Sequence, residues 1–313
     1  MAKKVKKIAV IGTGVIGTGW IIRLLVHGNK VWAFDPDKKQ EKIIIKEINR
    51  AKPFALKLSK KNKINLNNFK FVNSLKDAVQ NVDFIQECAP ENLKVKKLLI
   101  KEIEKYAKFR AIISSSSSGL LPSDIQNNCK NPQRILIGHP FNPVYILPLV
   151  EIVAGKKTNI KYIHQAEQFY KSLSMIPLIL KKEIPGYLSD RLQEALWRES
   201  LHIINEGLAS TEDLDKAIIH GPGLRWSLMG TFLTFHLAGG KLGMKHMLQQ
   251  FGPTLKLPWT KLKAPKLSKK LSKKIIDGTK KQSRGKSISH ITNIRDEYLI
   301  SLLKMRKKYE GRL

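Results

Sequence analysis

The stretch Ile8-Ala9-Val10-Ile11-Gly12-Thr13-Gly14-Val15-Ile16-Gly17 decides the fold. A helical pattern follows it, and then a second apolar run, residues 31–34, that ends at Asp35. An apolar run, a glycine loop, a helix and a second apolar run in this order predict a β-α-β unit with a dinucleotide site. Gly12 permits the tight turn, Gly14 lets the backbone approach a pyrophosphate, and Gly17 lets the helix pack against the strand. We expect residues 12–17 to contact the cofactor, whose phosphates face the N–H groups that begin the helix.

Asp35 determines which dinucleotide the site prefers. A carboxylate at the end of the second strand accepts hydrogen bonds from the adenosine ribose and repels a 2′-phosphate, so the sequence favours NAD over NADP. Lys38 and Lys39 follow closely and weaken that preference. A signal peptide or membrane anchor is the alternative interpretation, because residues 1–7 are basic and residues 8–22 carry no charge. The glycines in this run and its short length argue against both.

Length and cysteine content restrict the class of protein. With 313 residues, the chain is long enough for two domains that each bury a core. Cys88 and Cys129 are the only cysteines and form no CxxC pattern, which is typical of a reducing cytoplasm and argues against a disulfide scaffold. No group of His, Cys and acidic residues has metal-ligand spacing, so the sequence predicts no metal. No membrane partner is expected either.

The charge is strongly positive: 57 Lys and Arg against 25 Asp and Glu give a formal net charge of +32. Such a balance can indicate a nucleic-acid or anionic-membrane partner. Here the lysines are dispersed along the whole chain, are not interleaved with aromatic residues, and accompany no DNA-reading motif. We therefore expect no specific nucleic-acid partner, only weak binding that salt disrupts.

Short apolar runs alternate with helical patterns as far as residue 180, which predicts an open, mostly parallel sheet. A helix over 38–60 is expected to be interrupted at Pro53. Strands are expected at 69–72, 82–86, 111–113, 134–138, 149–153 and 175–180.

After Pro185-Gly186 the pattern is helical only, and Ser210 with Asp213 forms a capping box there. The sequence thus predicts an α/β fold: a Rossmann-type NAD-binding domain over 1–184, followed by an all-α domain over 185–313.

Candidate residues stand at the ends of several predicted strands. Gly12, Glu91, Ser118 and His139 each come just past a strand, and ligands of such sheets bind beyond the carboxyl ends of the strands. Glu151 follows His139 after a loop and a strand. A histidine base needs a partner on its other ring nitrogen, and a carboxylate fixes its tautomer and orientation well. Taken alone, however, a His–Glu pair at such loose spacing is more often surface chemistry.

These residues occur in motifs that resemble the 3-hydroxyacyl-CoA dehydrogenase superfamily over nearly the whole chain. The motifs are the Gly12 loop, residues 91–96, Ser118, residues 139–143 with Glu151, and residues 185–187. Longer stretches are similar to the L-carnitine dehydrogenases within that superfamily, namely 117–124, 138–145, 195–199, 221–226, 230–234, 251–253 and 258–262.

The resemblance implies oxidation of a secondary alcohol at C3, with NAD accepting the hydride. His139 would remove the hydroxyl proton as general base, and Glu151 would hold the imidazole and stabilise its cation. Ser118 would hydrogen-bond the reacting oxygen, and the serines at 114–117 are interpreted as loop residues around it.

Three further residues, Glu91, Lys96 and Asn142, match family positions near the cofactor. For Lys96, a solvated lysine on a helix surface is an equally good interpretation.

One position departs from the acyl-CoA enzymes. They carry an asparagine in the helix after Pro-Gly, where this chain has Asp190. An ionised aspartate cannot donate a hydrogen bond to a carbonyl, but it can attract a cation such as the trimethylammonium group of carnitine. The loop after the second strand is also short for a clamp on coenzyme A. Both features favour a small free substrate, and Asp190 joins the candidate catalytic residues.

A zwitterionic substrate needs two more contacts. Aromatic faces hold a quaternary ammonium because it has no N–H to donate. The candidates are Trp197, Trp226, Phe232, Phe235 and Tyr145, although core packing is the alternative for each. A carboxylate is best bound by an arginine fork, for which Arg225 is the first choice and Arg191 and Arg198 follow.

The sequence leaves rival functions open. The same chemistry could act on a 3-hydroxyacyl-CoA or on L-gulonate instead of L-carnitine. A non-catalytic binding or structural protein on the same fold is a candidate of another class. The resemblance also implies a homodimer formed through the helical domain.

Overall fold

The computed structural model describes residues 7–59, 64–227, 230–261, 266, 268–282, 284 and 286–308. The chain divides into two compact units, Met1–Asp190 and Arg191–Leu313. The predicted boundary after residue 184 lies slightly earlier in the chain, at the loop that precedes this division.

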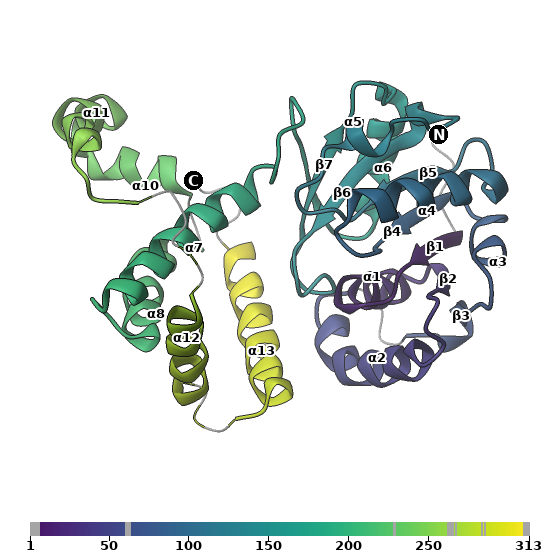
Figure 1. The fold of residues 1–313 in the computed structure, drawn as a ribbon, viewed down its shortest axis with the longest axis horizontal. Helices are drawn as coiled ribbons and strands as arrows, with labels where there is room; N and C mark the ends of the chain where they lie inside the picture. Colours follow the sequence, from purple (N-terminus) through teal and green to yellow (C-terminus); the bar gives the residue numbers. More distant parts are fainter. Residues whose placement is uncertain are drawn as a thin grey trace. The chain divides into compact units, whose positions relative to one another are not determined.

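The first unit is built on one eight-stranded sheet (Figure 1). Its strands are β1 (Lys7–Ile11), β2 (Lys30–Phe34), β3 (Phe69–Phe71), β4 (Phe84–Glu87), β5 (Ile112–Ser115), β6 (Ile135–Pro140), β7 (Leu149–Ala154) and β8 (Ile176–Ile179). Their order across the sheet is β3-β2-β1-β4-β5-β6-β7-β8. All neighbours are parallel except β6 and β7, which pair antiparallel. The mostly parallel sheet predicted from the sequence is confirmed.

Helices connect the strands of this unit. They are α1 (Val15–Val26), α2 (Gln40–Leu56), α3 (Leu75–Val79), α4 (Leu93–Tyr106), α5 (Pro122–Ile125) and α6 (Ile160–Ser172). The prediction that Pro53 interrupts the second helix is wrong, because α2 continues through it to Leu56. Phe54 and Ala55 are buried, and their packing holds the last turn helical although Pro53 has no N–H to donate.

The core lies on both faces of the sheet. Residues 8–11 of β1 are all buried, as expected for a central parallel strand covered on both sides. On one face, strand residues such as Ala9 and Ile11 form a single apolar cluster with Ile100 and Ile103 of α4 and Ile125 of α5. This packing fixes the strand ends, where the candidate residues stand.

The second unit consists of helices in the part of the chain that the structure describes. They are α7 (Ser189–Glu206), which begins just before the division, α8 (Thr211–Ile219), α9 (Pro222–Trp226), α10 (Thr231–Ala238), α11 (Met244–Phe251), α12 (Lys269–Gln282) and α13 (Ile288–Lys307). The capping box at α8 forms as predicted, with Ser210 accepting from the Asp213 N–H. None of the described helices has the length and apolar character needed to cross a membrane.

Candidate active site

The glycine loop between β1 and α1 has the shape that the sequence predicts for a phosphate cradle. Gly12 has a φ of +88°, and a Cβ there would lie 2.6 Å from the Cys88 carbonyl oxygen. A Cβ on Gly17 would lie 2.0 Å from the Gly12 carbonyl oxygen. Around Gly14, in contrast, no atom lies within 4 Å of an added Cβ. The loop is therefore closed behind Gly12 and Gly17 and open at Gly14, where helix α1 begins.

Asp35 closes the other side of this cradle. One of its carboxylate oxygens, Oδ2, accepts hydrogen bonds from the Thr13 main-chain N–H at 2.8 Å and the Thr13 hydroxyl at 3.0 Å. The other oxygen accepts from the Asp37 N–H at 3.0 Å. A carboxylate offers about four acceptor positions, so Asp35 retains capacity for ribose hydroxyls beside the loop. The residues present fit a dinucleotide.

His139 and Glu151 face each other across the antiparallel pair β6–β7. They are direct register partners, and His139 Nδ1 lies 3.0 Å from Glu151 Oε2. The imidazole is 4% exposed and the glutamate is fully buried. His139 does not follow its strand, as the sequence suggested, but lies inside β6 one residue before its end. The antiparallel return explains why two residues distant in sequence meet.

Glu151 also anchors the start of α7. Its Oε1 accepts hydrogen bonds from the Leu188 N–H at 3.2 Å, the Ser189 N–H at 3.0 Å and the Ser189 hydroxyl at 3.2 Å. Burial alone would raise the pKa of Glu151, but the hydrogen bonds from His139 and from these N–H groups outweigh burial and lower the pKa. Glu151 is therefore ionised at neutral pH and accepts from both sides.

The second ring nitrogen of His139 faces another carboxylate. Asp190 Oδ2 lies 3.5 Å from His139 Nε2, and its side chain is 31% exposed. The rings of Phe141 and Tyr187 pack against the imidazole, with centroids 4.8 and 5.5 Å away. Each ring nitrogen of the imidazole thus faces a carboxylate, and two aromatic rings pack against the imidazole.

Glu91 fastens the loop that carries Ser118. Its Oε1 accepts from the Ser117 hydroxyl at 2.5 Å and from the main-chain N–H groups of Ser118 and Gly119, both at 3.0 Å. The Ser118 side chain itself is exposed. The sequence places Glu91 and Ser118 just past the ends of two strands, but it does not show the hydrogen bonds that join Glu91 to this loop.

Known proteins resemble this chain along its length. Residues 7–184 match the NAD binding domain of 3-hydroxyacyl-CoA dehydrogenase, and residues 186–278 match its C-terminal domain. The chain belongs to the 3-hydroxyacyl-CoA dehydrogenase family. The L-carnitine dehydrogenase of Bacillus cereus is 48% identical to this chain, and the alignment covers 97% of this chain and 94% of the relative. L-carnitine dehydrogenase of Oceanobacillus iheyensis is 47% identical, covering 97% of this chain and 99% of its own.

Solved structures show the same fold. A 5-formyl-3-hydroxy-2-methylpyridine 4-carboxylic acid 5-dehydrogenase, an NAD-dependent dismutase, superposes with a TM-score of 0.79 at 23% identity, over 98% of this chain and 99% of the other. A 3-hydroxyacyl-CoA dehydrogenase of Archaeoglobus fulgidus has a TM-score of 0.63 at 26% identity, over 96% and 98% of the two chains. A member of this family with an intact NAD binding domain is an NAD-dependent oxidoreductase.

In this family member, Lys96 is buried and not solvated. Its side chain is 1% exposed, and Nζ donates to both oxygens of Glu87, at 2.9 and 3.1 Å, and to the Ala89 carbonyl at 2.9 Å. Glu91 Oε2 lies 3.8 Å from the same nitrogen. The solvated-lysine interpretation is therefore wrong. The chain turns after β4, so that α4 brings Lys96 against the buried carboxylate of Glu87 at the end of β4.

The prediction that the serines before Ser118 are loop residues is wrong for Ser114 and Ser115, whereas Ser116 and Ser117 lie in the loop after the strand. Ser114 and Ser115 belong to β5, and the serines at 114–117 are buried. Ser115 donates to Glu87, while the Ser116 hydroxyl accepts from the Trp20 indole at 3.1 Å and the Gln86 amide at 2.8 Å. A run of four serines carries no apolar signal, so the sequence could not show that its first two residues extend a buried strand.

The remaining predicted residues have different surroundings. Asn142 is exposed and comes just after β6. Tyr145 is only 8% exposed, and its hydroxyl accepts from Arg50 at 2.6 Å, so its ring is not an open face for a cation. Trp197 on α7 and Arg225 with Trp226 on α9 belong to the second unit, and the two tryptophans are 51% and 43% exposed.

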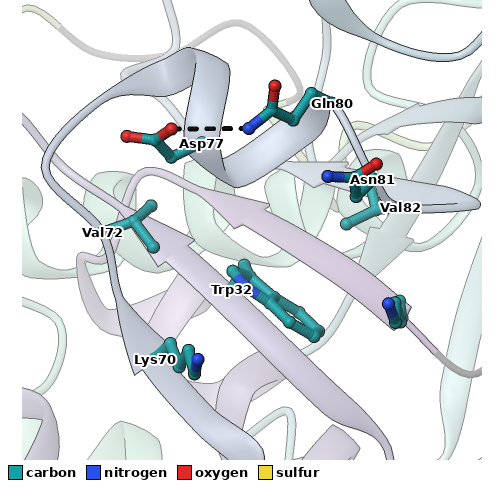
Figure 2. Close-up of a pocket in the computed structure, with 8 residues that line it drawn as sticks. Trp32, Lys70, Val72, Asp77, Gln80, Asn81 and Val82 are labelled. Atoms are coloured by element: carbon teal, nitrogen blue, oxygen red, sulfur yellow. Dashed lines mark hydrogen bonds between the residues drawn. The ribbon is translucent and has the colours of Figure 1, made fainter.

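A separate pocket lies over the middle of β2 and beside α3 (Figure 2). Trp32 forms its floor, with Lys70, Val72 and Asp77 around it. Lys7, the first residue of β1, places its Nζ 5.7 Å from the Trp32 ring centroid. Because Gly12 follows the last residue of β1, this pocket is not the dinucleotide cradle. Within the described residues, no group of three or more His, Cys, Asp or Glu side chains is arranged to hold a metal ion.

Proposed function

We propose that this protein oxidises the 3-hydroxyl of L-carnitine to 3-dehydrocarnitine, with NAD as hydride acceptor. The observation that carries the chemistry is the buried contact of 3.0 Å between His139 Nδ1 and Glu151. The observation that favours the substrate is the similarity to L-carnitine dehydrogenases, which are 47 and 48% identical over 97% of this chain.

His139 acts as the general base. Glu151 can only accept a hydrogen bond, so the neutral ring carries its proton on Nδ1 and its lone pair on Nε2. Nε2 then takes the proton of the substrate hydroxyl, and Glu151 stabilises the cation that forms. Ser118 holds the reacting oxygen, on a loop that Glu91 fixes in place.

NAD supplies the acceptor for the hydride that leaves C3. The open position at Gly14, between Thr13 and the first helical residues Val15 and Ile16, receives the pyrophosphate, and Asp35 accepts from the ribose. Glu91, Lys96 and Asn142 complete the cofactor side. The buried Lys96 acts there by holding Glu87 and the loop after β4 rather than as a free cation.

The helical domain supplies the rest of the substrate site. Arg225 binds the carnitine carboxylate through a bidentate fork, and Trp226 and Trp197 offer faces to the trimethylammonium group.

The direct test follows NADH absorbance when purified protein is mixed with NAD and L-carnitine at neutral to alkaline pH. We expect NADH to form with L-carnitine. With 3-hydroxybutyryl-CoA or L-gulonate, NADH should form far more slowly or not at all. Thermal shifts with NAD, NADP and L-carnitine report binding independently of turnover. A protein that binds NAD but oxidises none of these alcohols would support the non-catalytic alternative.

A homodimer in the cytoplasm is the second part of the proposal. Among the described residues after Asp190, the buried apolar side chains are few: Leu201, Ile204, Leu271 and Ile300. Phe232 and Trp259 are 86% and 67% exposed. Exposed apolar surface on this scale favours coverage by a second copy. Light scattering coupled to size exclusion should give twice the chain mass of 35.6 kDa, and a monomer at micromolar concentration would contradict it.

A further inference from the structure

We infer that Gln86 is a positioning residue for the general base. Its side-chain amide holds the main chain at Gly138, the residue before His139 in β6. The inference rests on the proposed function, because the position of this strand end sets how His139 meets the substrate hydroxyl. It assigns a role to a buried polar group that the mechanism does not otherwise use.

The end of β6 that carries His139 extends past its neighbour β5. The register between β5 and β6 ends at Ser115 and Ile137. From Gly138 to Pro140, the strand paired with β6 in the described chain is β7. A strand end that is paired along one edge opens more easily than a strand held on both edges. The position of His139 therefore depends on what holds the other edge.

Gln86 holds that edge from β4. Its side chain is 1% exposed, and Nε2 donates to the Gly138 carbonyl at 3.3 Å and to the Ser116 hydroxyl at 2.8 Å. Both hydrogens of the amide nitrogen are thus used. Ser116 also accepts from the Trp20 indole at 3.1 Å, which ties the same point to α1.

Gln86 and His139 lie on opposite faces of the sheet. Gln86 is in register with Ser114 of β5, and Ser114 is in register with Leu136 of β6, so the three side chains share one face. Gly138, two residues after Leu136, belongs to that face, and His139 points to the other. Gln86 therefore fixes the main chain beneath the base from the face away from the imidazole.

Tyr170 of α6 sets the orientation of the Gln86 amide. The Gly138 carbonyl can only accept, so the NH2 end of the amide faces it and the amide oxygen points away. That oxygen accepts from the fully buried Tyr170 hydroxyl at 2.8 Å. Burial raises the pKa of Tyr170, so the phenol stays neutral and keeps its proton for this bond. A Cβ on Gly138 would lie 2.0 Å from the same hydroxyl oxygen, so the tyrosine lies directly against the strand.

A second buried glutamine shows what a purely structural role would be. Gln126 is also 1% exposed, and its Nε2 donates to the Ile135 carbonyl at 2.9 Å. Ile135 is the first residue of β6, so Gln126 holds the end of the strand away from His139. Loss of either amide should destabilise the fold, because a buried carbonyl loses its donor. Loss of Gln86 should in addition displace the base.

Hydrogen exchange followed by mass spectrometry tests the strand end without any substrate. Gln86→Met keeps the length of the side chain and removes both donors. We expect residues 136–139 to exchange about tenfold faster in Gln86→Met than in wild type, because this strand end opens more often. In Gln126→Met, the matched control, residues 136–139 should exchange as in wild type. Exchange of residues 8–11 in β1 reports any global loss of stability in both variants.

Steady-state kinetics test whether this strand end positions the base. In Gln86→Met, kcat for L-carnitine should fall by roughly ten- to a hundredfold, since a base shifted by about 1 Å loses its alignment. KM for L-carnitine and the affinity for NADH should stay near the wild-type values, because Gln86 acts through the main chain of β6. Gln126→Met should keep the wild-type kcat. Fluorescence titration with NADH counts the folded sites in each variant, so a loss of folded protein is not taken for a loss of kcat.

Tyr170→Phe is a milder variant that keeps Gln86 in place. It should lower kcat less than Gln86→Met does. The double variant should be no slower than Gln86→Met, because Tyr170 acts through the amide.

Wild-type exchange at residues 136–139 in Gln86→Met would overturn the inference whatever the substrate. A wild-type kcat in Gln86→Met, or an equal loss of kcat in Gln126→Met, would overturn it as well. A wild type that oxidises no L-carnitine, with the expected change in exchange, would instead remove the proposed substrate and leave the link between Gln86 and β6 standing.

Discussion

At the scale of single residues, the His139 imidazole has two different edges. One edge is fixed by a fully buried glutamate in the neighbouring strand. The other edge faces Asp190, whose side chain is partly exposed to solvent. This asymmetry makes Nε2 the nitrogen that can exchange a proton with a ligand.

Replacing His139 by alanine should lower kcat by at least about a hundredfold, because the general base is lost. NADH affinity, measured by fluorescence titration, should remain nearly unchanged, since the glycine loop and Asp35 do not touch His139. Turnover that persists in His139→Ala at wild-type level would assign the base to another residue.

Glu151→Gln should reduce stability in a pH-dependent way. The pKa of Glu151 is lowered in the fold, so its contribution is present above the ordinary glutamate pKa of about 4.3 and is lost as pH falls below it. The gap in urea midpoint between wild type and Glu151→Gln should therefore be largest near neutrality and close toward pH 3. Glu41→Gln, on the exposed first turn of α2, is the control. A gap that widens in acid would contradict the assignment.

At the scale of elements, the carboxyl ends of β1, β4, β5 and β6 bring polar groups together that the chain keeps far apart. The ends of β4 and β5 and the first turns of α4 share one buried network, in which Lys96, Glu87 and Ser115 bond to one another. The glycine loop after β1 is closed by the Cys88 carbonyl, which follows β4.

Lys96→Met should lower the free energy of unfolding by about 3 kcal/mol, because it leaves Glu87 charged and buried without its cation. Adding Glu87→Gln should recover part of that loss. Lys108→Met breaks an exposed pair with Asp83 and should cost under about 1 kcal/mol. Urea denaturation of the four proteins measures all three changes, and similar losses for Lys96→Met and Lys108→Met would contradict a buried role.

Alanine at two positions of the glycine loop should separate folding from cofactor binding. Gly12→Ala forces a Cβ against the Cys88 carbonyl at a positive φ and should destabilise the protein by more than about 1 kcal/mol. Gly14→Ala meets no atom and has a φ of −61°, so the melting temperature should hardly change. Its affinity for NAD should nevertheless fall, because the added methyl occupies the approach of the pyrophosphate. Unchanged NAD affinity in Gly14→Ala would remove the cradle from the proposed site.

At the scale of the whole molecule, the formal net charge of +32 acts on every partner in solution. We expect weak binding to duplex DNA of any sequence, which should fall by orders of magnitude between about 0.05 M and 0.2 M salt. Fluorescence anisotropy over that range measures it, and the rate of NADH formation should not follow the same curve. DNA binding that survives physiological salt would instead support the nucleic-acid alternative.

The sequence by itself determined the elements whose signal is local. Apolar runs and glycines predict β1, its loop and α1, and Ser210 with Asp213 predicts a helix start, because turn geometry and capping depend on residues close in the chain. The doubly wound sheet and the family followed from these motifs. Local rules failed where burial decides. Pro53 remains helical, and Ser114 and Ser115 extend a strand, since distant packing partners outweigh local preference.

Only the tertiary structure decided which side chains meet. By spacing alone His139 and Glu151 are a loose pair, which the family resemblance singled out, and the antiparallel return of β7 makes them register partners. Lys96 against Glu87, Glu91 against the Ser118 loop, and Asp190 against Nε2 join elements whose spacing in the chain carries no signal. The physical reason is that contacts between strand ends depend on strand order and register, which the whole core fixes and no short stretch encodes.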